Sequence, residues 1–308
     1  MKQQWLGAAL GLVVLTGCSL DGIRPVRQEP QVVAHRGGTA DAPENTLLAI
    51  HRALDNHSEG LWLSVQASAD GVAVLYRPAD LSALTDAQGA VASKTLEQLR
   101  AVNAGYQFKD AAGAYPYRTA PQAIPTLAEA LRTIPAQVPL FLDIKARPVA
   151  DVIDAVARTL DQERAWARVR FYSTERDASD YLAQHYAGRA LNFESREATR
   201  NRLVDLALGG RCAPPAAGAW MGIELDRELT VTEQFTLGSS SHPVKPARLW
   251  TPEAMACVRR AGGTTVMMFG INSAAAYRTA RDLGADAVMV DSPASVPDYR
   301  RAAAQPGG

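Results

Sequence analysis

The sequence predicts an α/β protein that folds as a (β/α)8 barrel of the TIM type. Short apolar runs, typical of buried strands, alternate along the chain with segments of helical periodicity. That alternation is typical of repeated βα units around a mostly parallel sheet. The chain has 308 residues, 47% of them hydrophobic, so it can bury one large core. Barrels of this class, about 250 residues long, are common as single domains.

The balance of charged residues argues against a nucleic-acid partner. Lys plus Arg and Asp plus Glu both number 32, so the formal net charge is zero. A nucleic-acid-binding surface would instead show an excess or clustering of basic residues. We therefore expect no nucleic-acid partner.

Residues 1–18 are predicted to be a lipoprotein signal peptide outside the fold. Lys2 gives a positive start, 5–15 is an apolar run too short to span a bilayer, and small residues precede Cys18. This pattern resembles bacterial lipoprotein signals, which implies cleavage before Cys18 and lipid on that cysteine. The alternative is an ordinary signal peptide or membrane anchor in which the cysteine is incidental.

The predicted destination is the cell envelope. Ser19, rather than Asp, after the cysteine resembles the outer-membrane form of the sorting signal, so we expect an exported protein, lipid-anchored at the periplasmic face of that membrane. Residues 19–30, with two prolines and little apolar content, are expected to be a tether. The barrel is then expected over 31–303, with a tail at 304–308.

The expected elements follow in chain order. Strands are predicted at 31–34, 61–65, 72–76, 139–144, 168–172, 189–193, 220–225, 264–269 and 286–290. Helices are predicted at 45–55, 127–134, 148–162, 174–184, 195–208, 252–261, 273–283 and 295–303. The segment 228–250 shows no regular pattern, and we expect it to be irregular and able to fold over the barrel mouth.

Three local features refine this prediction. Asp70-Gly71 is a strong turn dipeptide joining two strands, and it places position 64 opposite position 77. Thr126 is a plausible cap of the helix that follows it. An oxidising compartment would allow Cys212 and Cys257 to form a disulfide, and two separate buried thiols are the equal alternative.

Several motifs in one order identify a family resemblance. They are His35-Arg36-Gly37-Gly38, Pro43-Glu44-Asn45-Thr46, Ile124-Pro125-Thr126-Leu127, Asp143-Ile144-Lys145 and the segment 284–293. Together they resemble the glycerophosphodiester phosphodiesterase family, a barrel of the phospholipase C-like phosphodiesterase superfamily. The resemblance implies hydrolysis of a glycerophosphodiester to glycerol 3-phosphate and an alcohol.

The resemblance assigns roles at the end of the first strand. His35 matches the first of the two catalytic histidines, and Arg36 matches the neighbouring arginine that binds phosphate. Glu44 and Asn45 match family residues that border the pocket. The alternative for this set is a buried histidine beside a helix-capping turn.

Other family positions carry different residues. Trp62 and Ser64 stand at the positions of the E-x-D metal ligands, and Arg77 and Pro78 replace the H-D pair that carries the second histidine. Asp143 remains as one exposed carboxylate, with Glu44 as a further candidate ligand. Hard cations need several anionic oxygens. We therefore expect no tight cofactor and at most weak Ca²⁺ or Mg²⁺ binding.

Cationic side chains are candidates to replace the ion. Arg77 and Lys145 are expected to join Arg36 in binding phosphate, since an arginine can neutralise phosphate with paired donors. No second catalytic histidine is evident: His51, His57 and His185 are expected away from the mouth, and His242 is a weak candidate.

Ile223-Glu224-Leu225-Asp226 repeats the metal motif too late in the chain and is interpreted as a barrel strand. The alternative is that Glu224 or Asp226 helps Asp143 to form a displaced metal site.

Three hypotheses about function follow. The first is a family member that binds a glycerophosphodiester or phosphate head group with weak or absent hydrolysis. The second is an active phosphoric diester hydrolase in which Arg77 replaces the metal. The third is a non-catalytic envelope protein that presents a surface to a partner. General acid–base groups each contribute about 10²–10⁴-fold to a rate, so the lost histidine favours the first hypothesis.

Overall fold

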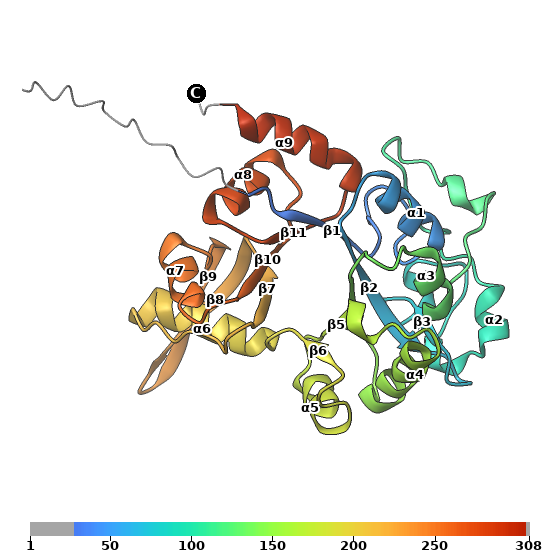
Figure 1. Cartoon of the computed structure of the whole chain (residues 1–308), viewed down its shortest axis with the longest axis horizontal. Helices are drawn as coiled ribbons and strands as arrows, with labels where there is room; N and C mark the ends of the chain where they lie inside the picture. The colour runs from blue at the N-terminus through green and yellow to red at the C-terminus, as the bar shows by residue number, and fades with distance from the viewer. Residues whose placement is uncertain (1–27, 306–308) are drawn as a thin grey trace, which may run out of the picture.

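Eight parallel strands form a nearly closed barrel in the structure, a computed structural model that describes residues 28–305 (Figure 1). Their order around the barrel is β6-β5-β4-β2-β1-β11-β10-β7, and a bridge between Phe193 and Trp220 links the two end strands. The strands are β1 (Gln31–His35), β2 (Gly60–Ala67), β4 (Leu140–Ile144), β5 (Val169–Tyr172), β6 (Leu191–Asn192), β7 (Trp220–Glu224), β10 (Thr265–Phe269) and β11 (Ala287–Val290). The predicted TIM-type barrel is confirmed.

The helices follow the strands and cover the outside of the barrel (Figure 1). They are α1 (Leu47–Asp55), α3 (Leu127–Thr133), α4 (Val149–Gln162), α5 (Arg176–His185), α6 (Arg196–Gly209), α7 (Pro252–Arg259), α8 (Ala274–Leu283) and α9 (Val296–Ala304). Each predicted strand and helix is present with ends within two residues of the prediction. Thr126 caps α3 as expected: its hydroxyl accepts from the Glu129 N–H, and the Glu129 side chain accepts from Thr126 in return.

Aromatic side chains fill the barrel interior. Trp62 lies at its centre, with its ring centroid 4.9 Å from that of Tyr172 and 5.1 Å from that of Phe269. Because successive strand residues point to opposite faces, the alternate residues pack outward against the helices. The interior cluster comprises Val33, Trp62, Phe141, Tyr172, Phe193, Met267, Phe269, Ala287 and Met289, all buried. The barrel is therefore a packed core with its functional surface at one end.

The segment between β2 and α3 forms a small lobe. Strand β3 (Ala73–Leu75) pairs antiparallel with β2, and α2 (Leu96–Arg100) follows among short 3-10 turns. The predicted register is wrong by one residue. Val65 pairs with Leu75, and the Tyr76 N–H donates to the Ser64 carbonyl at 3.1 Å, because the turn closes between Ser68 and Val72. Arg77 therefore lies one residue beyond the position opposite Ser64.

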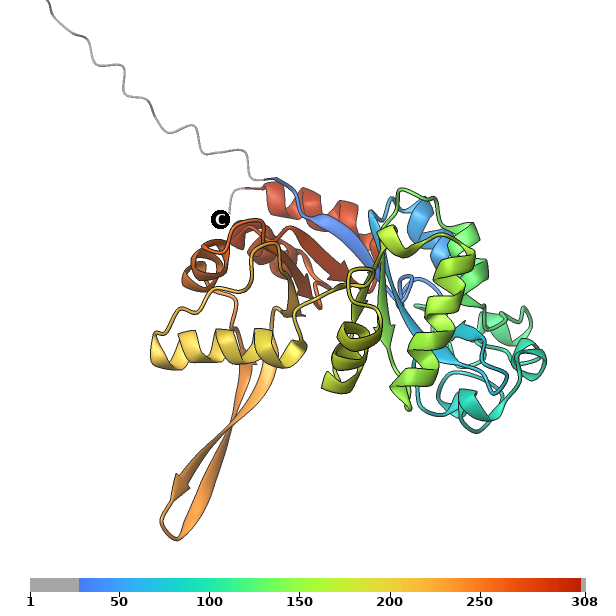
Figure 2. The same ribbon diagram turned by 60° about the horizontal axis from the view of Figure 1, so that its bottom comes forward.

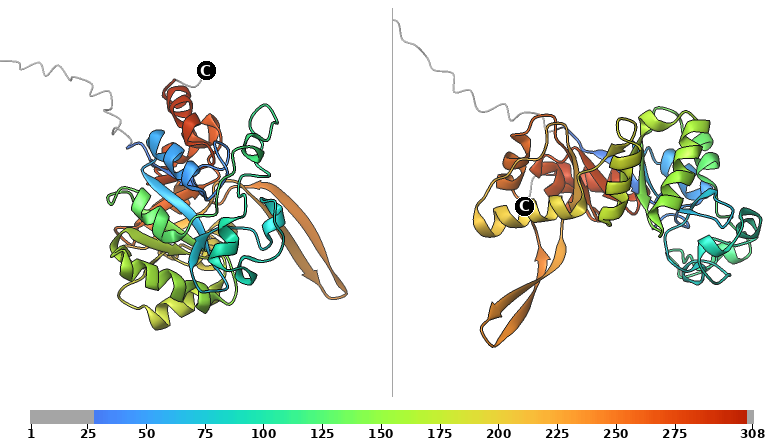
Figure 3. Two further views of the ribbon diagram at one scale, coloured as in Figure 1. Left: turned by 90° about the vertical axis from the view of Figure 1, so that its right-hand side faces the viewer. Right: turned by 90° about the horizontal axis from the view of Figure 1, so that it is seen from below.

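The prediction of an irregular segment at 228–250 is also wrong. Strands β8 (Arg227–Phe235) and β9 (Gly238–Ala247) form a two-stranded antiparallel hairpin. Pro243 and Pro246 obscured the strand pattern, but a hairpin with free outer edges tolerates proline. Figures 2 and 3 show the hairpin projecting away from the barrel instead of covering its mouth.

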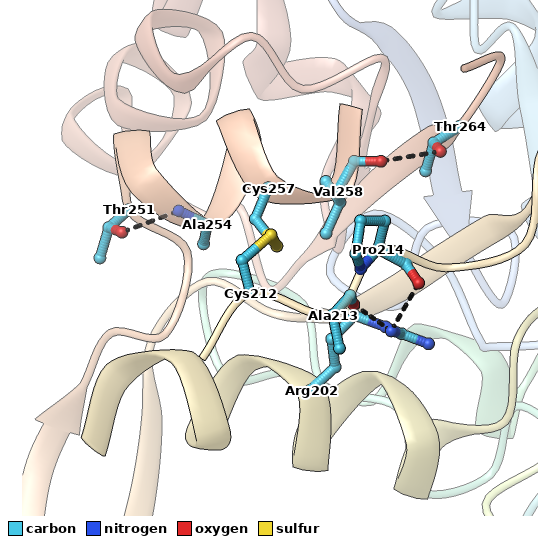
Figure 4. The surroundings of a disulfide bond; sticks show 9 residues. All are labelled: Arg202, Cys212, Ala213, Pro214, Thr251, Ala254, Cys257, Val258 and Thr264. Carbon is cyan, nitrogen blue, oxygen red and sulfur yellow. Dashed lines mark hydrogen bonds between the residues drawn. A yellow bond between two sulfur atoms is a disulfide. The ribbon is translucent and has the colours of Figure 1, made fainter. Parts of the chain in front are cut away.

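Cys212 and Cys257 form a disulfide that joins the loop after α6 to α7 (Figure 4). The two Cα atoms are 5.7 Å apart, and Cys257 is buried. The structure thus favours the disulfide over two separate thiols.

The predicted signal peptide at 1–18, the lipidation site Cys18 and most of the tether at 19–30 lie outside the described residues. Between residues 28 and 305, no helix is both long and apolar enough for a membrane span.

Candidate active site

The candidate site lies at the carboxyl ends of the strands, where β/α barrels place their functional side chains. His35 ends β1, Trp62 is its register partner on β2, and Asp143 lies on β4 beside Ser64 of β2. Tyr172 ends β5 and Glu224 ends β7. The mouth is therefore lined by neighbouring strands, although these residues are far apart in the sequence.

His35 is oriented by a carboxylate that the sequence interpretation assigned no role. Its Nδ1 lies 2.6 Å from Oδ1 of Asp291, the residue that follows β11. Asn272 donates from Nδ2 to Oδ2 of Asp291 at 2.5 Å, and its Oδ1 accepts from the Asp291 N–H at 2.8 Å. The hydrogen bond from His35 lowers the pKa of Asp291. Since Nδ1 is engaged, Nε2 is the ring nitrogen left for a ligand.

Asp291 and Asn272 had a signal in the sequence. Asp291 stands in the motif at 284–293, which served only as a landmark of the family, and Asn272 follows β10. The sequence interpretation did not use the closure of the barrel, which brings Asp291 beside His35. The last strand, β11, pairs with the first, β1, so the end of each lies beside the other.

Arg36 is held by Glu44 in a strained loop. Arg36 Nη1 lies 2.6 Å from Glu44 Oε2, and the two side chains are 20% and 12% exposed. Arg36 and Asn45 both have positive φ, at 51° and 58°, which is uncommon for residues other than glycine. Gly37 follows at φ 82°, where an added Cβ would lie 2.9 Å from the Ala49 Cβ. The backbone thus places the guanidinium at the mouth with a fixed partner.

Asn45 ties this loop to β2. Its Oδ1 accepts from the Ser64 N–H at 2.9 Å, and its own N–H donates to the Arg36 carbonyl at 2.8 Å. The Asn45 side chain is 1% exposed. Asn45 is therefore a rigid link between the two halves of the site.

Asp143 is buried, so the expectation of an exposed carboxylate is wrong. Lys145 Nζ lies 3.1 Å from its Oδ2, and Trp62 Nε1 donates to the same oxygen at 3.4 Å. Burial raises the pKa of Asp143, and the nearby Lys145 opposes that shift. The Trp62 ring, at the position of a family metal ligand, is buried beside this carboxylate.

Four buried polar atoms at this mouth have no hydrogen-bond partner among the described residues. They are Glu44 Oε1, Asn45 Nδ2, Ser64 Oγ and Asp143 Oδ1. Buried polar atoms in folded proteins are almost always paired, so a group of unpaired ones marks a place where a ligand or ordered water belongs.

A cavity of ≈ 400 Å³ adjoins Lys145 at this end of the barrel. Gln66, Arg147 and Glu175 are among its polar lining, and Ala79 and Ala146 are among its apolar lining. Arg77 is exposed, and its side chain makes no ion pair or hydrogen bond within residues 28–305. The contacts thus connect Arg36 and Lys145 with the site, whereas Arg77 remains a predicted phosphate ligand outside this network.

The late copy of the metal motif is engaged in ion pairs. Arg196 Nη2 donates to both carboxylate oxygens of Glu224 at 2.7 Å, and Arg248 Nε donates to Asp226 at 2.8 Å. Glu224 ends β7, as the barrel-strand interpretation requires. In the described part of the chain, no three side chains of His, Cys, Asp or Glu gather as metal ligands would.

The other histidines lie on the surface. His51 on α1, His57 in the following loop, His185 on α5 and His242 on the hairpin are all exposed. His185 stacks on Tyr181, with ring centroids 4.2 Å apart. None of the four contacts His35, Arg36 or Asp143.

Comparison with known proteins agrees with this geometry. Residues 35–295 match the glycerophosphoryl diester phosphodiesterase family. The chain belongs to this family. It is 42% identical over 297 residues to the protein Rv2277c of Mycobacterium tuberculosis, covering 94% of this chain and 98% of that one. Family membership supports a phosphodiesterase-type function.

Two solved family structures share the barrel. The glycerophosphoryl diester phosphodiesterase domain of Rv2277c superposes with a TM-score of 0.84 at 42% identity, covering 89% of this chain and 100% of that one. The phosphodiesterase OLEI02445 of Oleispira antarctica, crystallised with the product sn-glycerol-3-phosphate, superposes with a TM-score of 0.63 at 24% identity. It covers 88% of this chain and 97% of the Oleispira chain, and it supports the fold alone.

Proposed function

We propose that this family member binds a glycerophosphodiester, or its glycerol phosphate portion, at the mouth of the barrel and hydrolyses it weakly or not at all. The observation that carries the proposal is the presence of two unpaired buried donors, Asn45 Nδ2 and Ser64 Oγ, beside His35 and Arg36. An unpaired donor and a free ring nitrogen, next to a fixed guanidinium, form a suitable environment for a phosphate anion.

Each of these groups would contact a different part of the ligand. Arg36, already oriented by Glu44, would neutralise the phosphate, and Asn45 Nδ2 and Ser64 Oγ would donate to its oxygens. His35 Nε2 would meet the bridging oxygen. The product complex of the Oleispira phosphodiesterase supports a small phosphate ligand for this barrel. The cavity beside Lys145 gives room for the rest of the molecule.

Weak hydrolysis follows from proton transfer. His35 can take or return one proton, and Asp291 would stabilise the charged ring while it does so. A second group must serve the other oxygen, but Arg77 and Pro78 stand at that family position, and an arginine does not release its proton near neutral pH. One of the two acid–base steps therefore lacks its residue.

The residues present do not fit a tight divalent cation. Asp143 and Glu44 would be its ligands, but each is already paired with a cationic side chain, Asp143 with Lys145 and Glu44 with Arg36. Ca²⁺ takes about six to eight oxygens. We propose only weak Ca²⁺ or Mg²⁺ binding, and no catalytic step depends on a metal here.

Export and lipid anchoring through Cys18, at the periplasmic face of the outer membrane, belong to the same proposal. The sequence of residues 1–19 supports it. The disulfide between Cys212 and Cys257 gives independent support for export, because such bonds form and persist in oxidising compartments.

The test combines binding with turnover on the chain from Ser19 to Gly308. We expect calorimetry to detect glycerol 3-phosphate binding that Arg36→Gln removes, together with little or no hydrolysis of glycerophosphocholine, with or without chelator. Efficient hydrolysis that ignores chelator and disappears in Arg77→Ala would support the active hydrolase instead. Absence of any phosphate binding would support the non-catalytic envelope protein.

A further inference from the structure

The opposite half of the mouth carries a second charged group that the proposed function does not use. It consists of Tyr172 at the end of β5, Arg196 and Arg200 on α6, Glu224 at the end of β7, and Arg227 at the start of β8. Tyr172 is the register partner of Asp143, so this group shares the mouth with the phosphate site. We call Arg196, Arg200 and Arg227 the arginine cluster.

Glu224 organises the arginine cluster. Arg196 Nη2 lies 2.7 Å from each carboxylate oxygen of Glu224, and Arg196 Nη1 donates to the Tyr172 hydroxyl at 3.0 Å. Arg227 Nε lies 3.7 Å from Glu224 Oε2, too far for a hydrogen bond. Arg200 lies one helical turn after Arg196, and among the described residues its side chain bonds only to the neutral Asn201 side chain. Both carboxylate oxygens of Glu224 therefore accept from Arg196, and the ion pair with Arg227 is longer.

The arginine cluster has unneutralised positive charge. Glu224 forms ion pairs with both Arg196 and Arg227, and Arg200 lies near Arg227 without a carboxylate partner among the described residues, so positive charge is in excess here. Arg227 is 16% exposed, and its side chain donates no hydrogen bond to any residue from 28 to 305. Its Nη1 is buried without an acceptor. Burial lowers the pKa of Arg227; the charge of Glu224 opposes that shift, and the neighbouring Arg196 and Arg200 add to it.

An anion would satisfy this arrangement. Unpaired guanidinium nitrogens in a partly buried site gain from a phosphate or carboxylate, which accepts several hydrogen bonds in one plane. A cationic group such as a quaternary ammonium would instead be repelled by the excess charge.

We propose that the arginine cluster binds an acidic group, a phosphate or carboxylate, on the alcohol portion of the ligand whose phosphodiester lies at Arg36. This inference rests on the proposed function, since it assigns the far end of the same ligand. The preferred ligand then carries two acidic groups, one at each half of the mouth. Neutral or cationic alcohols bind less tightly.

The experiment measures the dissociation constants of glycerophosphoinositol 4-phosphate and glycerophosphoinositol by calorimetry with the full chain. These two probes differ only by the second phosphate. We expect the phosphorylated probe to bind at least about ten-fold more tightly. Arg227→Gln should reduce that preference to about two-fold or less. Arg200→Gln, on the partly exposed helix surface, should act in the same direction if Arg227→Gln does not fold.

The matched control is Arg248→Gln, which removes an equal charge near the root of the hairpin, where Asp226 is the partner. It should leave both constants unchanged. Equal affinity of the original protein for the two probes would overturn the inference while leaving the proposed function intact. A preference that survives both Arg227→Gln and Arg200→Gln would also overturn it. If Arg36→Gln had no effect and Arg227→Gln abolished binding, the proposed function would fail and the acidic subsite would stand.

Discussion

His35 and Trp62 are register partners on adjacent strands, yet their side chains lie in opposite environments. At the end of β1, His35 and Arg36 are polar, partly exposed and held by the carboxylates of Asp291 and Glu44. On β2, Trp62 is 2% exposed and contacts four aromatic rings of the barrel interior. The comparison teaches that the loop after β1 presents polar, partly exposed groups at the mouth, whereas β2 contributes an aromatic side chain to the buried core.

The unpaired atoms lie where the two halves meet. Asn45 and Glu44 belong to the loop after β1, and Ser64 and Asp143 belong to β2 and β4. Asn45 joins the halves through the Ser64 N–H. A ligand at this boundary would satisfy atoms from both sides, so binding and packing can be separated by mutation.

The largest expected effect concerns packing. Trp62→Ala should lower the free energy of unfolding by about 3–5 kcal/mol, because it empties the centre of the aromatic cluster. His35→Ala should change it by no more than about 1 kcal/mol. Urea denaturation measures both. Trp166→Ala is the control, since Trp166 is only partly buried and lies outside the barrel. Equal losses for Trp62 and His35 would break the comparison.

The second prediction reverses the change at β2. Trp62→Glu combined with Ser64→Asp should place three carboxylates together with Asp143. The variant starts less stable, as Trp62→Ala does, and Ca²⁺ should stabilise it by about 2.7 kcal/mol at a hundred times its dissociation constant. The original protein should gain much less, because Lys145 and Arg36 already neutralise its carboxylates. Thermal unfolding with calcium or chelator is the measurement. An equal calcium shift in the original protein would contradict the prediction that it has no tight cation site.

The third prediction separates ligand binding from stability. Ser64→Ala should weaken glycerol 3-phosphate binding by about ten-fold, or about 1.4 kcal/mol. Stability should stay equal or rise, because the variant removes a buried hydroxyl without a partner. Ser58→Ala is the matched control: Ser58 Oγ is also buried and unpaired, but it precedes β2 at the other end of the barrel. A loss of affinity in both variants would mean that Ser64 does not contact the ligand.

Sequence reasoning found the barrel because its strands are buried on both faces and so read as apolar runs. It also found Arg36 and His35 through local motifs. It missed Asp291, whose partner is 256 residues away, because only barrel closure brings β11 beside β1. It missed the hairpin because exposed strands rich in Ser, Thr and Pro lack the apolar alternation that reveals a half-buried strand. It judged Asp143 exposed because burial depends on Trp62 from a different strand.

The smallest expected effect is a pair of pH dependences, one from each half. The His35 hydrogen bond holds the pKa of Asp291 below its ordinary value, so its stabilising contribution is complete above about pH 3.9 and is lost as the pH falls below that. Solvent screening at a side chain that is 37% exposed limits it to under about 1 kcal/mol. Asp291→Asn should therefore be less stable than the original protein near pH 6, and the difference should shrink on acidification.

Asp143 should show the opposite sign. Burial raises its pKa, so the folded protein binds that proton more tightly than the unfolded chain, and the contribution of Asp143 to stability falls as the pH rises above about 3.9. Relative to Asp143→Asn, the original protein should lose stability with rising pH, whereas relative to Asp291→Asn it should gain. Urea unfolding of the three proteins between pH 3 and 7 measures both slopes. Slopes of the same sign would mean that the two carboxylates share one environment, and that the division of the mouth into a prepared polar half and a buried aromatic half is wrong.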